Sequence, residues 1–292
     1  MKYKNRMLFA AMVSLWGLGW PIMKIGLDSS YPFIFIAHRL LFASIFLLAL
    51  NILTKTRMPT DWKTLKGILI YSLFSTLSFA STTVGLASHG SGFVSVLMYS
   101  QPIMVFILSV RFLGEKFSVP RLFGIALGFS GVAALFLQDG GATLSWTAFL
   151  VLIGALFWAV GTVYYKRKLQ SLDAQVVNLA QVALTLIVMF GISMLTEPLF
   201  EAWSITYLAT LAYAGIGAAG VGMTIWLVLL EDKEATLLSG SSLIVPVLAL
   251  FFSWILIGEE LNLQVLLGAV LVLGGVYLVN KTRTTTKNVT QP

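Results

Sequence analysis

The sequence predicts an all-α membrane protein with ten transmembrane helices, arranged as two inverted five-helix repeats. Three observations lead to this fold class: an apolar composition, ten long apolar runs separated by short polar breaks, and a segment that occurs twice in the chain. The three are independent, because composition, spacing and repetition do not follow from one another.

The composition excludes an ordinary soluble domain. Of the 292 residues, 58% are hydrophobic and 11% are charged, and the mean hydropathy is +0.90; such values are typical of a chain that crosses the bilayer several times. The chain has no cysteine and only two histidines. We therefore expect no disulfide, no metal site and no cofactor.

Ten apolar runs are long enough to cross a hydrocarbon layer of about 30 Å, which takes about 20 residues of helix. The basic start of the chain and the first run also resemble a signal peptide, but this run is too long and lacks a cleavage site, so a retained helix is expected. The ten predicted spans are Met7–Leu27, Phe33–Leu53, Lys66–Leu86, Ser91–Phe112, Pro120–Gln138, Trp146–Tyr165, Asp173–Leu195, Ile205–Leu230, Ala235–Ile257 and Leu263–Asn280.

Lysine and arginine gather in alternate connections between these runs. They occur at the N-terminus, in the even-numbered loops and in the C-terminal tail, and the odd-numbered loops have none. Seventeen of the nineteen basic residues lie in these connections or at the span ends beside them, and only Lys24 and Arg39 lie deeper inside spans. Because cytoplasmic loops collect Lys and Arg, both termini are expected in the cytoplasm of a prokaryote, with the spans in its plasma membrane.

One segment of the chain is repeated at a spacing of 144 residues, as residues 85–132 and 229–276. Without gaps, Pro102 superposes on Pro246 and Gly114-Glu115 superposes on Gly258-Glu259. A spacing of this length indicates two homologous halves rather than a solenoid. We predict a first repeat over residues 1–140, a second over 141–283 and a disordered tail over 284–292.

Five spans in each half make the second repeat run in the opposite direction to the first, because an odd number of crossings reverses the chain. The pair Gly114-Glu115 is then on the cytoplasmic side, and its twin Gly258-Glu259 is on the other side. Inverted repeats of this kind are typical of secondary transporters that alternate access around a site at the membrane midplane.

Pro102 and Pro246 lie near the centres of spans four and nine. Each lacks an N–H donor and crowds the carbonyl four residues earlier, at Met98 and Ser242. Prolines are common in transmembrane helices and can serve packing alone. Their recurrence at matched positions favours a pair of hinges close to a substrate site.

Polar and aromatic residues within the spans are the candidate lining of that site. Small hydroxyls also hold helices together, but as a stripe they favour a water-accessible wall. The candidates are Ser75, Phe79 and Thr82 in span three; Ser95, Tyr99 and Gln101 in span four; and Ser239, which superposes on Ser95, with Ser242 in span nine.

Four tryptophans lie away from the span ends: Trp16 and Trp20 in span one, Trp158 at the duplicated position in span six, and Trp226 in span eight. Either they fill the core or their indoles stack on an aromatic or amphipathic solute or cation. The intramembrane cations also allow two interpretations. Lys24 and Arg39 either snorkel to the interface or attract a carboxylate or phosphate of a substrate.

With these residues in place, the sequence resembles the EamA-like ten-helix family of the drug/metabolite transporter superfamily. The resemblance rests on Trp16, Pro21 and Lys24 in the first span, Arg39 in the second, and the ordered sets Pro102, Gly114-Glu115, Gly124 and Pro246, Gly258-Glu259, Gly268. It implies a basket-like carrier with a central cavity that moves amino acids or other small metabolites, often outward. Organic anions and drug-like cations remain alternative cargoes.

Other functional classes fit less well. An intramembrane enzyme is the main alternative, but the chain has no His-Glu-x-x-His motif and no pair of mid-membrane carboxylates. A channel or sensor subunit would be expected to show a filter or an output domain. The basic residues form no nucleic-acid patch, so the expected partners are the lipid bilayer and a small-molecule substrate; the choice between monomer and homodimer stays open. Without a mid-span carboxylate, flux down the solute gradient is favoured over proton coupling.

Overall fold

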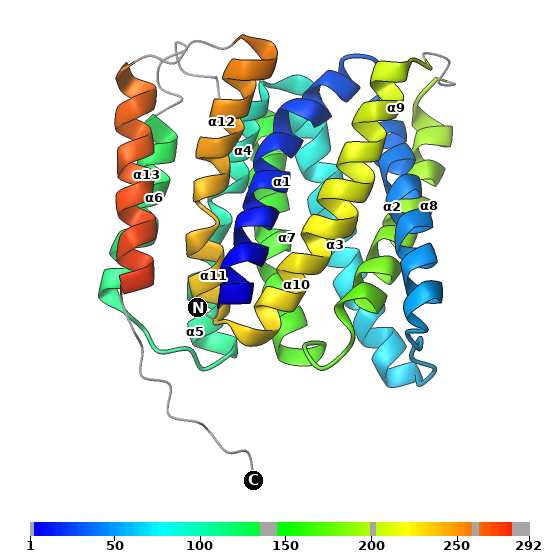
Figure 1. Ribbon diagram of the computed structural model, residues 1–292, viewed down its shortest axis with the longest axis horizontal. Coiled ribbons are helices and arrows are strands. Elements are labelled where there is room, and N and C mark those ends of the chain that lie inside the picture. The colour runs from blue at the N-terminus through cyan, green and yellow to red at the C-terminus, as the bar shows by residue number, and fades with distance from the viewer. Residues whose placement is uncertain (1–2, 135–144, 199–202, 259–262, 282–292) are drawn as a thin grey trace.

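The structure, a computed structural model, describes residues 3–134, 145–198, 203–258 and 263–281, and over these ranges the chain forms helices and short connections without a strand. The helices lie side by side in one bundle (Figure 1). In chain order they are α1 (Tyr3–Leu27), α2 (Pro32–Thr54), α3 (Trp62–Ser88), α4 (Ser91–Met98), α5 (Gln101–Phe112), α6 (Val119–Ala134), α7 (Trp146–Lys168), α8 (Ala174–Thr196), α9 (Ile205–Ala212), the π-helix η2 (Tyr213–Gly222), α10 (Met223–Asp232), α11 (Ala235–Ser241), α12 (Ile244–Ile257) and α13 (Leu263–Lys281).

Each of the ten predicted spans coincides with a helix or a continuous series of helices. Seven runs over the described residues are long and apolar enough to cross a membrane, and shorter apolar helices account for the remainder. Large apolar side chains such as Ile45, Leu48 and Ile187 are exposed on the outside of the bundle, where a bilayer would cover them. The all-helical membrane fold is thus confirmed. The predicted tail, residues 284–292, lies outside the described residues.

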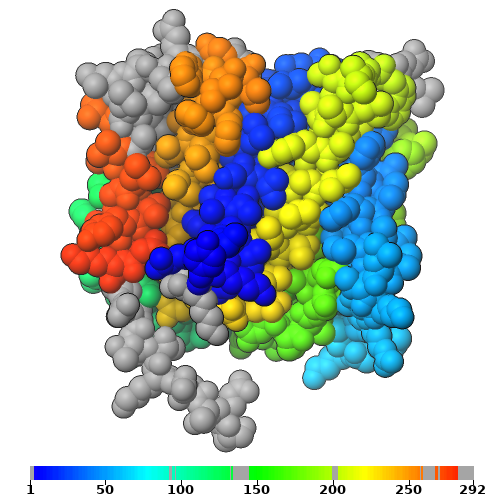
Figure 2. Space-filling view, in the orientation of Figure 1, coloured from blue at the N-terminus to red at the C-terminus, as the bar shows by residue number. Residues whose placement is uncertain are grey.

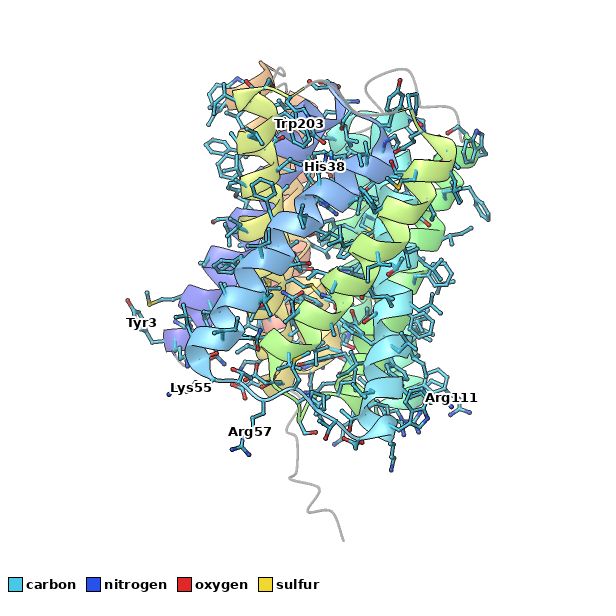
Figure 3. All side chains as sticks on the ribbon, turned by 90° about the vertical axis from the view of Figure 1, so that its right-hand side faces the viewer. Tyr3, His38, Lys55, Arg57, Arg111 and Trp203 are labelled. Carbon is cyan, nitrogen blue, oxygen red and sulfur yellow. The ribbon has the colours of Figure 1, made fainter. Side chains whose placement is uncertain are left out.

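The two ends of the bundle differ in charge. Tyr3, Lys55, Arg57 and Arg111 lie at one end, hereafter the basic end, and His38 and Trp203 lie at the other, hereafter the far end (Figure 3). The helix α1 begins, and α13 ends, at the basic end (Figure 1). The separation of charge along the bundle axis agrees with the alternation of basic loops in the sequence.

Two of the predicted spans are broken rather than kinked. Span four divides between α4 and α5, and span nine divides between α11 and α12. At the first break the Ser100 hydroxyl donates to the carbonyl of Leu97 at 2.7 Å, and at the second the Ser242 hydroxyl donates to the carbonyl of Ser239 at 2.7 Å. Pro102 is the second residue of α5, a position where the missing N–H leaves no hydrogen bond unmade.

Span eight contains the π-helix η2 between α9 and α10. The wider turn redirects backbone carbonyls, which neighbouring helices bind with side chains. The Trp16 indole donates to the carbonyl of Ala218 at 3.2 Å. The buried amide of Asn178 on α8 donates to the carbonyls of Ala219 at 2.9 Å and Gly220 at 3.0 Å. Because π-helical turns are rare and cluster at functional sites, η2 is a candidate part of a functional site.

The helices that meet at the centre come from both ends of the chain. In Figure 2, α1 lies between α12 on one side and the span of α9 to α10 on the other, and the three are closely packed. Glycines allow this approach: a Cβ at Gly17 would lie 2.6 Å from the Cβ of Leu248, and one at Gly222 would lie 2.8 Å from the Trp16 indole nitrogen. The first helix is therefore held against the second half of the chain.

Candidate functional site

A cavity with about 860 Å³ of empty space, including the part that opens to the outside, lies among these helices. It takes its lining from the second half of α1, the start of α2, the second half of α3, the first break, the middle of α7, and η2 with the start of α10. Because α1 and α3 run from the basic end and α2 runs toward it, these portions place the cavity nearer the far end.

Eight of the fourteen predicted binding residues line this cavity, and six do not. Those that line it are Trp16, Trp20, Arg39, Phe79, Thr82, Tyr99, Gln101 and Trp158. Of the other six, Ser75 and Trp226 line a second, smaller cavity, and Lys24, Ser95, Ser239 and Ser242 line neither. The structure thus brings together residues from five separate spans that the sequence marked by polarity or aromatic character.

Arg39 is the one charged side chain among the described residues of the lining. It is 6% exposed, its guanidinium lies over the Phe79 ring at 5.5 Å from the centroid, and one of its terminal nitrogens contacts the sulfur of Met23. Its Nε has no hydrogen-bond partner among the described residues. A buried guanidinium held only by an aromatic face and a thioether retains donors for an anionic ligand.

Lys24 has a different environment, although the sequence paired it with Arg39. Its ammonium donates to the carbonyl of Leu86 at 3.4 Å and lies 3.7 Å from the carboxylate of Asp28, and the side chain is 27% exposed. These contacts fit the snorkelling alternative, since the charge reaches toward the far end of the bundle rather than into the cavity.

Three of the four tryptophans form a cluster. The ring centroids of Trp16 and Trp158 are 5.7 Å apart, those of Trp16 and Trp226 are 5.5 Å apart, and those of Trp158 and Trp226 are 5.9 Å apart. Trp226 is 1% exposed and, unlike Trp16 and Trp158, does not line the large cavity. We call Trp16, Trp158 and Trp226 the tryptophan layer.

The smaller cavity lies on the basic side of this layer. It is lined by residues from nearer the basic end of α3, α7 and α10, among them Tyr71, Ser75 and Thr162. Trp158 and Met223 line both cavities. The two side chains therefore form the partition between a large cavity toward the far end and a small one toward the basic end.

Beyond the small cavity, contacts between side chains close the basic end. The rings of Tyr71 and Tyr165 lie 5.6 Å apart, and the Tyr165 hydroxyl donates to the Glu231 carboxylate at 3.2 Å. The Lys166 ammonium donates to the carbonyls of Leu230 and Glu231 at 2.7 Å and 2.8 Å. These contacts join α3, α7 and α10 across the path that would lead from the small cavity outward.

A second set of contacts at the basic end holds the start of α11. The Glu115 carboxylate, in the connection between α5 and α6, accepts hydrogen bonds from the backbone N–H groups of Ala235 at 2.7 Å and Thr236 at 3.3 Å. Arg121 on α6 pairs with Glu234. Burial raises the pKa of Glu115 above its usual value. The hydrogen bonds from the backbone N–H groups of Ala235 and Thr236 offset part of this cost of ionising Glu115.

The remaining serine candidates are packed into helix contacts. Ser95 and Ser239 have no exposed surface, and Ser242 is 1% exposed. Gln101 differs, because it lines the large cavity and its Oε1 has no hydrogen-bond partner among the described residues. Thr82 donates to the sulfur of Met98 at 3.4 Å. The polar character of the large cavity thus rests on Arg39, Gln101, Tyr99 and two threonines.

Sequence reasoning missed several lining residues, namely Gly19, Met23, Leu86, Met98, Ala218, Ala219 and Met223. Most are apolar, and apolar residues carry no mark that separates a cavity wall from a lipid-facing surface. The glycines of η2 were the available signal for Ala218 and Ala219, since Gly217 and Gly220 flank them. Over the described residues, no group of three His, Asp or Glu side chains could hold a metal ion.

Relatives of known sequence span most of this chain. The uncharacterized transporter YvbV of Bacillus subtilis (strain 168) is 28% identical over 285 residues, which cover 96% of this chain and 92% of the relative. A Salmonella typhimurium protein named "Probable amino-acid metabolite efflux pump" is 26% identical over 95% of both chains. The uncharacterized inner membrane transporter YedA of Escherichia coli (strain K12) is 27% identical over 87% of this chain and 84% of the relative.

A solved crystal structure shares the fold, with a TM-score of 0.81 and 18% identity over 96% of this chain and 99% of the other. The model of the EamA-like transporter family matches twice in succession, over residues 5–137 and 145–281. The two matches leave little of the chain uncovered, and the named relatives are transporters. This chain therefore belongs to the EamA-like transporter family of membrane transporters, in the drug/metabolite transporter superfamily.

Proposed function

We propose that the protein is a secondary transporter that moves small amphipathic metabolites, amino acids or related compounds, by alternating access and in the outward direction. The observation that carries the proposal is the large cavity with a buried cation, Arg39, among aromatic side chains, closed toward the basic end by Trp158 and Met223. A closed partition between two cavities is what one state of an alternating-access carrier requires.

The arrangement of the two halves supports this mechanism. The first broken span starts with α4 near the far end and ends with α5 at the basic end, whereas the second starts with α11 at the basic end and ends with α12 near the far end (Figure 1). Equivalent elements of opposite direction are expected of inverted repeats, with halves close to residues 1–140 and 141–283. The prolines at both breaks then act as the hinges at which each half changes shape.

The basic end is assigned to the cytoplasm, and the membrane to the plasma membrane of a prokaryote. The assignment is supported by the gathering of Lys55, Arg57 and Arg111 at that end and by the relative named as an inner membrane transporter. The large cavity then faces away from the cytoplasm in this structure. Outward transport is supported by the relative named as an efflux pump.

The described lining of the large cavity contains no carboxylate that could carry a proton with the substrate. Glu115 and Glu231 lie at the basic end, beyond the tryptophan layer. We therefore expect flux to follow the solute gradient without a proton gradient.

The test is counterflow in proteoliposomes. Vesicles loaded with unlabelled solute receive trace amounts of a radiolabelled amino acid, organic acid or amphipathic cation, with and without a pH gradient. We expect the protein to accumulate at least one label transiently without a gradient, whereas protein-free vesicles do not. Failure with all three classes would contradict transport, and flux only with a pH gradient would contradict the uncoupled mechanism.

A further inference from the structure

The charges in the large cavity do not balance. Among its described lining residues, Arg39 contributes one positive charge, and no Asp or Glu contributes a negative one. Asp28, which directly follows α1, lies 3.7 Å from the Lys24 ammonium and does not line the cavity. The site therefore carries a net charge of one sign in a buried, mostly apolar setting.

A buried and unpaired cation is costly, and a bound anion relieves that cost. Arg39 is 6% exposed, and neither the Phe79 ring nor the Met23 sulfur carries a formal negative charge. The guanidinium presents its N–H groups in a planar fork, which matches the two oxygens of a carboxylate. One carboxylate neutralises the site, whereas a second negative charge on the ligand would again be unpaired.

An ammonium group on the ligand would lack a counter-charge. The described groups that could accept from it are neutral: the Gln101 Oε1, which has no partner, and the hydroxyls of Tyr99, Thr82 and Thr83. Aromatic faces add only a modest cation–π attraction. Burying a full charge with only neutral partners costs more than that, so a zwitterion pays a desolvation penalty that a simple anion avoids.

The rest of the wall is suited to an apolar body. Trp16, Trp20, Trp158 and Phe79 offer ring faces, and Met23, Met98 and Met223 offer flexible thioethers. Indole and phenyl surfaces favour flat apolar groups, and thioethers adapt to their outline. The cavity therefore combines one anion site with an aromatic and sulfur-rich wall.

We infer that the substrate of this site is a monocarboxylate with an apolar, preferably aromatic body and a net charge of −1, bound more tightly than the zwitterionic amino acid or the amine of the same size. This inference rests on the proposed transport function and narrows its substrate class. Arg39 is the residue that determines charge selectivity, and Gln101 remains available to a neutral donor, such as a hydroxyl, on the ligand.

The test uses three ligands with the same ring and nearly the same length: 3-phenylpropionate, phenylalanine and phenethylamine. Binding to the full chain in detergent is followed by quenching of tryptophan fluorescence, since three tryptophans line the cavity. We expect 3-phenylpropionate to bind at least about tenfold more tightly than phenylalanine, and phenethylamine to bind weakest. The inference is overturned if phenylalanine binds as tightly as 3-phenylpropionate, or if phenethylamine binds most tightly of the three.

Variants of Arg39 test whether this residue determines the preference for 3-phenylpropionate over phenylalanine. In Arg39→Gln the advantage of 3-phenylpropionate over phenylalanine should disappear, and Arg39→Lys should retain part of it, because an ammonium keeps the charge without the fork. Arg57→Gln makes the same chemical change at an exposed position at the basic end and should leave the ratio unchanged. If Arg39→Gln does not fold, Arg39→Lys still tests the inference. If this variant binds 3-phenylpropionate with unchanged affinity and with an unchanged advantage over phenylalanine, the planar guanidinium has no role in selectivity.

The outcomes separate this inference from the proposed function. The ligand ranking is an equilibrium measurement without a membrane, so it can hold even if no counterflow is found. Counterflow that favours phenylalanine, in contrast, would support transport and contradict the monocarboxylate. Protein-free vesicles at the same pH correct for passive entry of the protonated acid.

Discussion

The two helix breaks have related sequences, but they have different surroundings. At the first break, Met98, Tyr99 and Gln101 line the large cavity. At the second, no described residue lines either cavity; Ser239 and Ser242 are buried, and a Cβ at Gly240 would lie 2.9 Å from a methyl of Val279 on α13. The duplicated motif therefore determines where a helix breaks, but it does not determine what the break faces.

The difference extends to the ends of these helices. The start of α11 is held by Glu115 and by the ion pair of Arg121 with Glu234 at the closed basic end. The start of α4, by contrast, has Gly90 as its N-cap, without a side-chain hydrogen bond. If the two halves exchange roles during transport, the second break should face a cavity open to the basic end in the opposite state.

The largest expected effect concerns chemical access to the two breaks. The chain has no cysteine, so single cysteines can be placed without further change. We expect Gln101→Cys to react with a membrane-impermeant thiol reagent on the order of a hundredfold faster than Ser242→Cys when the reagent is added from the far side, because only the first break lines a cavity here. Rates follow from mass spectrometry at timed intervals.

The same pair also tests the exchange of roles. When the reagent is added from the basic side under conditions of active exchange, Ser242→Cys should become reactive. Equal rates for the two cysteines from both sides would contradict the contrast between the breaks. A cysteine at exposed Arg57 serves as the control for which side the reagent reaches.

The next largest effect is on turnover at the two prolines. Pro102→Ala and Pro246→Ala each restore an N–H and allow a more continuous helix across the break. We expect each to slow counterflow about tenfold while changing ligand affinity less than about twofold, because the hinge would act on the transition between states. Unchanged turnover in both variants would show that the prolines serve packing alone.

A smaller effect is expected on stability from Gly240→Ala. The added methyl would meet Val279 at 2.9 Å and Ile125 at 3.4 Å, and such overpacking typically costs ~1–3 kcal/mol. Gly90→Ala is the matched control at the first broken span, where a Cβ would meet nothing within 4 Å. Thermal unfolding in detergent should show a lower midpoint for Gly240→Ala than for Gly90→Ala, and the reverse order would contradict the packing of the second break.

The smallest effect is the pH dependence of the anchor on α11. Burial raises the pKa of Glu115 in the folded protein, so the folded state holds its proton to higher pH than the unfolded state does. Its contribution to stability is therefore present at low pH and falls as pH rises from the unfolded pKa through the raised folded pKa. Glu115→Gln should flatten the fall in unfolding midpoint over that range; an unchanged slope would show that another group titrates there.

The sequence was informative wherever a residue has a distinctive backbone, charge or ring that a plain apolar helix does not need. Prolines placed both breaks within a few residues, and alternate basic loops matched the two ends of the bundle. Arg39 and the tryptophans stood out because a charge or an indole in mid-span needs a reason. The structure brings Arg39, Trp16, Trp20 and Trp158 together around the large cavity, and Trp226 lines the smaller one.

The sequence could not show whether an apolar or small polar side chain faces the cavity, the protein core or the lipid. In a membrane both the lipid and the protein core are apolar, so Met98 and Met223 in the cavity wall look like residues that face lipid. Ser95 and Ser239 look like lining residues, although they are fully buried between helices. The π-helix that places Ala218 and Ala219 on the cavity also depends on side chains of other helices, Trp16 and Asn178.

By itself, the sequence determined the order of the apolar helices, the placement of the start of α1 and the end of α13 at the same end of the bundle, and the positions at which two helices break. These follow from the length of apolar runs, the placement of Lys and Arg, and the backbone chemistry of proline, all of which are local. Only the tertiary structure decided which break faces the cavity, which cation is buried there, and which end is closed. Those features depend on how each helix is rotated against its neighbours, and helix rotation is set by contacts between residues far apart in the chain.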